Sequence, residues 1–398
     1  MKVSSPSAPP APPPPAAAPP EPAKPAKLNW YDRLSLRGYG QFRYNRLLSD
    51  LGVFGEDNDR YVSPIGDRTI GAKNGFSLRR ARLIVGGDVS SHVFVYVQSD
   101  IANAVGDSSG FMQMRDYYAD VAVDADKAFR FRIGQSKVPY GWENMQSSQN
   151  RGPLDRSEAI NSGAPGERDM GLFFYFAPPA TRALFKRLVD EGLKGSGDYG
   201  MVAVGTYGGQ SANKPEANDS RHYVVRVAVP FELGSQIVEL AAGGYYGKIV
   251  VPLDAKTPAK TPDGPDLLDA RVHATAVLYP KPIGLQAEYT VGKGPETRYG
   301  ELRSRPLHGG YVMVNAKVGP LFPFVRAQQY TGGRKAETNA PTQRLLEIEP
   351  GLEWQIDKAF ELTVSYAYGH RTFTTSDPGK GSQGVNGQMF RLQAQLNF

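Results

Sequence analysis

The chain ends with the run Met389-Phe390-Arg391-Leu392-Gln393-Ala394-Gln395-Leu396-Asn397-Phe398. From Phe390 onward every second residue is apolar, and the residues between them are polar. Side chains of a β-strand point alternately to opposite faces, so this run predicts a strand with one apolar and one polar face. Such a strand fits the surface of a soluble sheet, and it also fits the wall of a membrane barrel.

Composition excludes several classes of protein. Only 40% of the 398 residues are hydrophobic, and no segment approaches the ~20 consecutive apolar residues of a membrane-spanning helix. A helical membrane protein is therefore excluded, whereas a barrel with a polar inner face is not. The 44 Gly, 21 Tyr and 18 Phe suit turns and interfacial aromatic residues. Cysteine is absent, which excludes a disulfide framework and thiol chemistry. The net charge of +6 is compatible with anionic ligands but does not identify them.

Connections of two lengths alternate along the chain after residue 30. Short turns are predicted at 89–92, 123–127, 232–235, 280–282, 319–320 and 356–358. Longer polar segments are predicted at 46–74, 101–111, 142–167, 209–221, 251–267, 293–308, 331–342 and 372–386. One exception is 178–198, which is long where a short turn is due and contains the helix-like piece 181–188.

This layout predicts an all-β fold, a transmembrane antiparallel barrel of about sixteen strands over residues 30–398. A β-sandwich would not sort its connections by length in this way. The terminal strand ending in Phe398 resembles the closing strand of bacterial outer-membrane barrels. We therefore expect the bacterial outer membrane as the location. An even number of strands puts both chain ends on one rim, which we expect to face the periplasm.

Residues 1–29 are predicted to be a disordered periplasmic tail. Residues 1–27 consist mainly of Pro, Ala, Ser and Lys, with eleven prolines, and cannot bury enough apolar area to fold. No apolar stretch follows Met1, so no export signal is visible. We expect this sequence to begin after its export signal, or at a start placed too far downstream.

Alternation within strands assigns several arginines to the inner face. A charge on the lipid face near the midplane costs ~2–4 kcal/mol, so Arg130 and Arg132 should face the lumen. Placing Ala81, Leu83 and Val85 outward sends Arg80 and Arg82 inward and Arg79 outward, close to the rim. Asp116 and Asp120 also belong to an inward set, so the lumen is mixed, with arginine in excess on the first five strands. The plain alternative is that such charges, Arg391 among them, only solvate a water-filled interior.

Residues 75–177 carry a family resemblance. The runs Gly75–Leu83, Arg115–Asp120 and Arg132–Glu143 occur in the order and spacing of the phosphate-selective porin O and P family. The same family order continues with Ser147, Ser148, Arg151, Arg156, Ser157, Gly166, Glu167, Arg168 and Gly171. The remaining chain resembles that family mainly in its strand layout. The resemblance implies a homotrimeric sixteen-stranded porin whose third loop, residues 142–167, folds into the lumen as a constriction.

The predicted anion pathway combines both lines of reasoning and comprises Arg80, Arg82, Arg130, Arg132, Lys137, Arg151, Arg156 and Arg168. Guanidinium groups offer fixed donors that fit phosphate oxygens, whereas a lysine acts as a point charge. Acidic neighbours in the loop, such as Asp155 and Glu167, could neutralise part of this charge. For Arg151 and Arg156, salt bridges that anchor the loop are an equal alternative.

The predicted function is passive diffusion of small solutes with a preference for anions, phosphate or polyphosphate being candidates. A non-selective porin and a structural or partner-binding barrel are the alternatives. An enzyme is disfavoured, because the five histidines are scattered and form no triad or zinc spacing. The Gly-rich piece 205–209 lacks the Lys-Ser/Thr of a phosphate-binding loop. We expect no cofactor, no metal and no nucleic acid, and outer-membrane lipid and small anions as partners.

Overall fold

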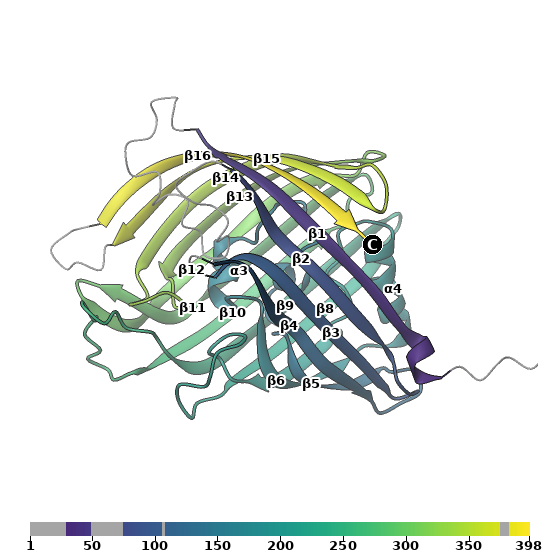
Figure 1. The fold of residues 1–398 in the computed structure, drawn as a ribbon, viewed down its shortest axis with the longest axis horizontal. Coiled ribbons are helices and arrows are strands. Elements are labelled where there is room, and N and C mark those ends of the chain that lie inside the picture. The colour runs from purple at the N-terminus through teal and green to yellow at the C-terminus, as the bar shows by residue number, and fades with distance from the viewer. Residues whose placement is uncertain (1–28, 49–74, 106–107, 375–381) are drawn as a thin grey trace, which may run out of the picture.

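A closed barrel forms the body of the protein, as a computed structural model shows for residues 29–48, 75–105, 108–374 and 382–398 (Figure 1). Within these ranges sixteen strands pair antiparallel, each with its neighbours in sequence, and β16 pairs with β1. The predicted fold class is confirmed. The predicted tail, apart from Asn29, lies outside the described residues.

The strands are β1 (Leu34–Leu47), β2 (Gly75–Asp88), β3 (Val93–Val105), β4 (Ser108–Ala122), β5 (Phe129–Lys137), β6 (Arg168–Phe176), β7 (Val202–Tyr207), β8 (His222–Leu233), β9 (Gln236–Val250), β10 (Asp266–Leu278), β11 (Ile283–Arg298), β12 (Glu301–Ala316), β13 (Leu321–Gly333), β14 (Thr342–Gln355), β15 (Phe360–Thr374) and β16 (Ser382–Asn397). The helices are η1 (Trp30–Arg33), α2 (Trp142–Met145), α3 (Glu158–Gly163) and α4 (Pro179–Asp190). None of the helices in the described ranges is long and apolar enough to cross a membrane.

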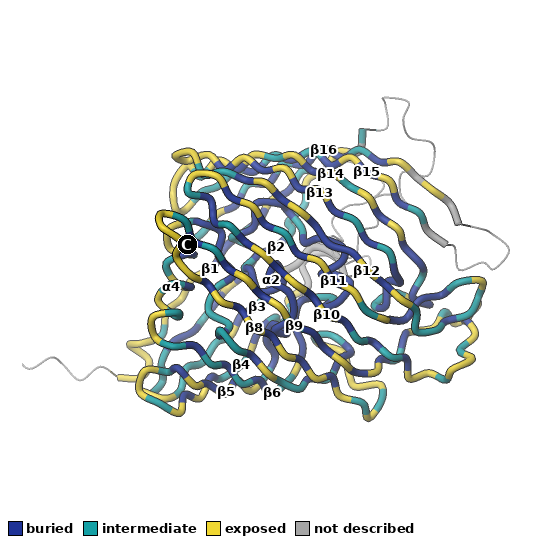
Figure 2. The backbone as a smooth tube through the Cα atoms, turned by 180° about the vertical axis from the view of Figure 1, so that it is seen from behind, coloured by how far each residue is buried: buried dark blue, intermediate teal, exposed yellow. Residues whose placement is uncertain are grey.

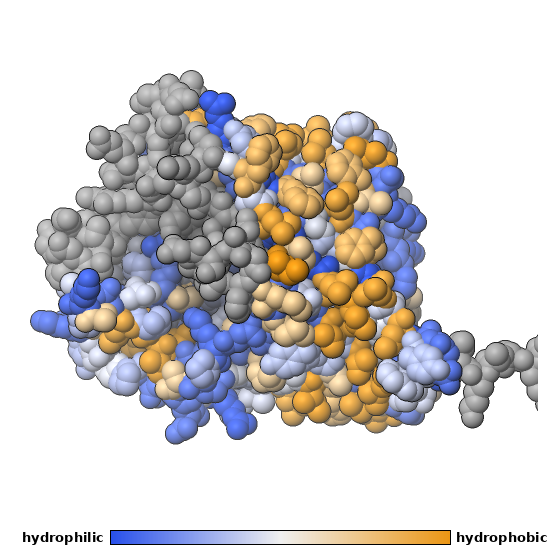
Figure 3. Space-filling model, viewed as in Figure 1, coloured by the Kyte–Doolittle hydropathy of each residue, from blue (hydrophilic) through white to orange (hydrophobic). Residues whose placement is uncertain are grey.

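Burial alternates along the strands, as the change between dark blue and yellow in Figure 2 shows. In β8, for example, Val225 and Val227 are exposed on the outer face while Arg226 between them is buried. On the face seen in Figure 3, apolar side chains gather over the strands toward the right of the view, with hydrophilic side chains at the right-hand edge. This pattern follows from the two-residue period of a strand and from the high cost of charge against lipid.

The last residue seals the barrel against the first strand. The backbone N–H of Phe398 donates to the Gly38 carbonyl at 3.0 Å, and the Gly38 N–H donates to the Phe398 carbonyl at 2.7 Å. A Cβ on Gly38 would lie 2.5 Å from the Phe398 ring, so the absent side chain gives that ring its place. The alternating run that ends the chain is therefore the closing strand, β16.

All six short turns occur where they were predicted, on the rim that we call the short-turn rim (links 89–92, 123–128, 234–235, 279–282, 317–320 and 356–359). Two predicted long loops are wrong. The segments 101–111 and 293–308 are mostly strand, because β3–β4 and β11–β12 continue as paired ribbons beyond the point where apolar alternation stops. Backbone pairing does not require an apolar face once the strands leave the membrane.

The β6–β7 link confirms the helix-like piece at 181–188 as part of α4. Phe185 packs against Ala228 and Ala241 at the short-turn rim. Beyond α4 the chain crosses the lumen, because Lys194 forms a buried ion pair with Glu353 of β14. β14 lies eight strands from β6 in a ring of sixteen, which is the opposite wall. We call residues 191–199 the crossing segment.

Arg79 does not point outward as expected. The pairing of β1 with β2 shifts between Gln41 and Phe42, whose partners are Arg80 and Leu78, so Arg79 is the extra residue of a β-bulge. The bulge turns Arg79 into the lumen, where its guanidinium lies 3.6 Å from the Asp155 carboxylate. A bulge interrupts the alternation from which the outward orientation was predicted.

Candidate functional site

The long link between β5 and β6 folds into the barrel, and we call its residues 138–167 the inner loop. Its two helices, α2 and α3, are fully buried, and α3 contacts β11, β12 and β13 (Figure 1). The Glu288 carboxylate of β11 accepts the backbone N–H groups of Trp142 at 2.6 Å and Glu143 at 3.1 Å. The first turn of α2 is thus fixed to the barrel wall through backbone N–H groups that have no partner within the helix.

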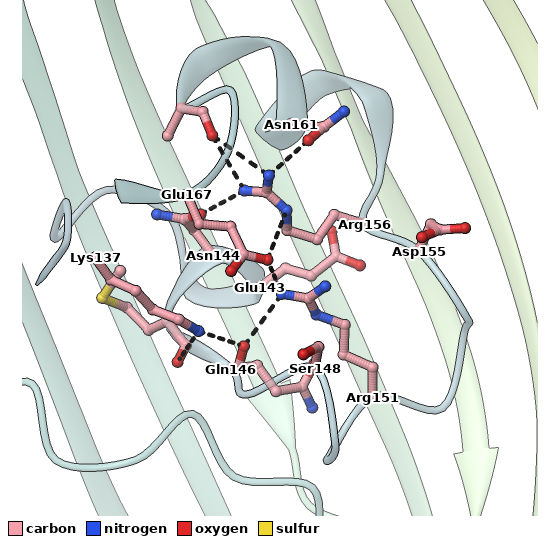
Figure 4. A network of polar contacts seen from close by, with 12 residues as sticks. Lys137, Glu143, Asn144, Gln146, Ser148, Arg151, Asp155, Arg156, Asn161 and Glu167 are labelled. Atoms are coloured by element: carbon pink, nitrogen blue, oxygen red, sulfur yellow. Dashed lines mark hydrogen bonds and ion pairs between the residues drawn. The ribbon is translucent and has the colours of Figure 1, made fainter. Parts of the chain in front are cut away.

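Glu167 is the centre of the inner loop's ion pairs (Figure 4). Its carboxylate lies 2.6 Å from Arg151, 3.4 Å from Arg156 and 2.5 Å from Arg168. Burial alone would raise the pKa of the Glu167 carboxyl, but the surrounding cations hold this pKa well below its usual range. Arg151 and Arg156 therefore have the loop-anchoring contacts that the sequence left as an equal alternative.

Lys137 is buried and supports the loop from the end of β5. Its ammonium donates to the carbonyl oxygens of Met145 at 3.1 Å and Gln146 at 2.7 Å (Figure 4). Within the described part of the chain it has no carboxylate at ion-pair distance. Its ammonium is thus solvated by backbone carbonyl dipoles, and the Glu167 carboxylate attracts it from beyond ion-pair distance.

Asp155 ties the inner loop to the strands that close the barrel. Its carboxylate lies 3.0 Å from Arg43 of β1, 2.5 Å from Arg391 of β16 and 3.6 Å from Arg79 of β2. Burial would raise the pKa of Asp155, but these guanidinium groups hold it well below its usual range. Arg391 thus has a specific partner, which corrects the view that it only solvates the lumen.

The predicted arginines of the strands are inside the barrel, and most face a carboxylate. Arg82 of β2 lies 3.0 Å from Asp100, its cross-strand partner on β3. Arg132 of β5 makes two hydrogen bonds, of 2.7 and 2.8 Å, to its cross-strand partner Asp120. Two further pairs are Arg130 with Asp198 and Arg168 with Asp116, both at 2.8 Å.

Arg80 differs from these residues. It is buried and donates to the Gln41 side chain at 2.7 Å, and no carboxylate of the described residues forms an ion pair with it. Three other arginines add like charge beside it, and the Asp155 carboxylate offsets part of that charge.

A cavity of about 480 Å³ lies between the inner surface of β1–β5, the inner loop and the crossing segment. Eight Lys or Arg side chains line it and only four Asp, and we call it the basic cavity. Five of the predicted pathway residues line it: Arg82, Arg130, Arg132, Lys137 and Arg168. The other three, Arg80, Arg151 and Arg156, lie in the lumen but not on this cavity.

Arg37 of β1 was not among the predicted pathway residues, yet it lines the basic cavity. Its side chain is exposed there and has neither an ion pair nor a hydrogen bond among the described residues. The alternation of β1 already placed Arg37 on the polar face, so the sequence signal was present. Arg43 and Arg391 could likewise have been placed together, because barrel closure brings the first and last strands side by side.

The wall formed by β9–β14 has the opposite character, because its carboxylates are covered. Glu288 accepts from the inner loop, and Glu353 pairs with Lys194 of the crossing segment. Asp269 pairs with Lys335, which also donates to the Gly163 carbonyl of the inner loop. Among the described residues no group of three or more His, Asp or Glu side chains is placed to hold a metal ion.

Solved structures of outer-membrane proteins share this fold. DcaP, an outer-membrane channel of Acinetobacter baumannii, is 13% identical with a TM-score of 0.55, covering 92% of this chain and 97% of that one. An anion-selective porin from Comamonas acidovorans is 9% identical with a TM-score of 0.54, covering 92% and 99%. The trimer form of OmpT from Vibrio cholerae is 12% identical with a TM-score of 0.50, covering 92% and 99%.

At these identities the likeness is one of fold. No curated protein sequence matches the chain. A family model does, and it is described as phosphate-selective porin O and P, with matches at residues 56–256 and 252–398. These matches span most of the chain and agree with the barrel fold. The chain belongs to the phosphate-selective porin O and P family.

Proposed function

We propose that this outer-membrane porin passes small anions by passive diffusion, and that the basic cavity is their route past the inner loop. The observation that carries the proposal is the lining of the cavity, with eight cations against four carboxylates. A cleft with an excess of one sign of charge concentrates the opposite ion. No group in this proposal does chemistry on the solute.

Pairing of the cations tunes how strongly an anion is held. Most lining arginines already face a carboxylate, so each attracts an incoming anion only weakly. Arg37 has no carboxylate partner among the described residues and supplies uncompensated positive charge. Conduction needs this combination, because an ion that is bound tightly at one site cannot leave it.

The short-turn rim faces the periplasm in this proposal, together with both chain ends. Outer-membrane barrels have short turns on the periplasmic side and longer loops outside. A homotrimer is the proposed assembly, supported by the trimer form in which the OmpT barrel is found. The anion would then leave the basic cavity toward the periplasm, beside the crossing segment.

A KCl gradient across a planar bilayer holding the porin tests the anion preference. The reversal potential should show chloride more permeant than potassium. Arg37→Gln should lower the chloride-to-potassium permeability ratio about twofold, because one uncompensated charge leaves the cavity wall. Arg303→Gln, the same charge change at a half-buried site on the rim opposite the short turns, should leave the ratio unchanged. A potassium preference in the unmodified porin would overturn the proposal.

Phosphate is the proposed physiological solute, because the family bears that description and the lumen offers several guanidinium groups. Submillimolar phosphate should reduce chloride current through the open channel. Sulfate at the same concentration is the matched control for charge. If both ions reduced the chloride current equally, the protein would be a general anion porin and the phosphate assignment would be wrong.

A further inference from the structure

Aromatic side chains line one side of the basic cavity, which transport of inorganic anions does not require. Phe94 and Tyr96 of β3, Tyr118 of β4 and Tyr199 of the crossing segment all border it. The Tyr96 and Tyr118 rings stack with their centroids 5.1 Å apart, and Phe94 follows at 6.5 Å from Tyr96. A porin lumen is normally polar, so this is unusual apolar surface for water to cover.

The backbone makes room for these rings. Gly86 of β2 is the cross-strand partner of Tyr96, and a Cβ at Gly86 would lie 3.2 Å from the Tyr96 ring and 3.6 Å from the Phe94 ring. The two rings thus lean over a position that has no side chain. The guanidinium of Arg132 lies 3.7 Å from the Tyr118 ring centroid, so the aromatic run ends on a cation.

Arg37 stands beside this aromatic run. It pairs across β1–β2 with Ile84, and Ile84 pairs with Gln98, the lumen-facing residue after Tyr96 on β3. Arg37 is therefore about 10 Å, or two strand spacings, from the strand that carries Tyr96. The intervening strand has Ile84 at the level of Arg37 and Gly86 at the level of Tyr96, so the Tyr96 ring leans over β2 toward the strand that carries Arg37.

From this arrangement we propose that the basic cavity binds a small aromatic monocarboxylate, with its ring against Tyr96 and Tyr118 and its carboxylate on Arg37. This inference rests on the proposed anion pathway and names a solute class for it. One planar carboxylate matches one guanidinium in a bidentate pair. Arg37 is the lining guanidinium without a partner among the described residues, so a single negative charge is what this place can neutralise.

Benzoate and cyclohexanecarboxylate separate the ring from the charge, because they have the same charge and nearly the same size. In planar bilayers holding the full-length porin, each is added on the short-turn side, and the concentration that halves the chloride current is measured. Benzoate should act at a concentration about two- to tenfold lower, which is the worth of an aromatic pair beyond its buried area. Equal concentrations for the two compounds would overturn the inference.

Single substitutions show which residues cause the difference between the two carboxylates. Tyr96→Leu and Tyr118→Leu should each bring the ratio between the two compounds close to one. Tyr368→Leu, at an exposed position of β15, is the control and should keep the ratio of the unmodified porin. Arg37→Gln should weaken the effect of both compounds equally. If the tyrosine variants retain the ratio, benzoate acts elsewhere and this site is wrong.

The outcomes distinguish this inference from the function on which it rests. A potassium preference in the KCl gradient would remove the anion pathway itself. Chloride preference with equal action of both carboxylates would keep the pathway and remove only the aromatic site. Each variant is first shown to form the folded barrel by its heat-dependent mobility in detergent gels and by its KCl conductance.

Discussion

The two sides of the lumen differ in which charged side chains are exposed to the pore and which are covered. On the β1–β6 side, Arg82 and Arg132 each face a carboxylate on the adjacent strand, whereas Arg37 lines the basic cavity without an ion pair among the described residues. On the β9–β14 side, carboxylates such as Glu288 and Glu353 are covered by the inner loop and the crossing segment. The loop thus removes acidic groups from the pore as well as narrowing it. Selectivity in this barrel depends on what is buried as much as on what is exposed.

Removing the part of the inner loop that covers the carboxylates of β9–β14 should have the largest effect on ion selectivity. Replacing residues 143–163 by a short Gly-Ser linker uncovers Glu288 and Asp269, so the chloride preference should be lost and conductance should rise about twofold or more. Single-channel recording in KCl gradients measures both quantities. Retention of the full chloride preference would contradict the role assigned to the covered carboxylates. Heat-dependent gel mobility checks that the shortened chain still closes.

Breaking a pair on the basic side should affect stability more than selectivity. Arg132→Gln leaves Asp120 buried without its cation, which should cost about 3–5 kcal/mol in the free energy of unfolding. The double variant Arg132→Gln with Asp120→Asn removes the uncompensated charge and should recover much of that loss. Denaturant unfolding in lipid vesicles compares the three proteins. Equal stabilities of the single and double variants would show that the pair is not coupled.

Asp155 offers a smaller test, since it compensates arginines where the inner loop meets the closing strands. Asp155→Asn keeps the size of the side chain and removes one negative charge beside Arg43, Arg79 and Arg391. The chloride-to-potassium permeability ratio should rise about two- to threefold at low salt and less at high salt. Asp254→Asn, on the exposed β9–β10 link, is the control for charge. A lower ratio in the Asp155 variant would contradict this reading.

The smallest expected change is with pH. The pKa values of Asp155 and Glu167 are depressed in the fold, so their ion pairs are fully present above the ordinary carboxyl pKa of about 4. They are lost only as pH falls through the lower, folded values. The chloride preference should therefore stay nearly constant between pH 7.5 and 5.5. A marked change in reversal potential within that window would mean that these carboxylates titrate there.

Strand alternation predicted the barrel, the short-turn rim and the inward direction of Arg80, Arg82, Arg130 and Arg132. Resemblance added the inner loop, which no pattern of periodicity locates inside a lumen. The orientation of Arg79 could not be predicted, because a bulge depends on pairing with another strand. The partners of the charges were also hidden, since Arg391 and Asp155 are 236 residues apart in sequence. Alternation assigns a face to a residue, whereas register and loop packing decide what it meets there.

The crossing segment has a consequence for how such a channel can diversify. In a barrel the strand count sets the circumference, and changing it means adding a paired strand that still closes. Here the crossing segment, residues 191–199, spans the lumen at the short-turn rim. It belongs to a single connection and is held to β14 on the opposite wall by the ion pair of Lys194 with Glu353. Insertions or deletions in that connection would change the width of the pore at the short-turn rim without altering the register of any strand pair. Barrel size and exit width are thereby set by separate parts of the sequence, and they can evolve independently.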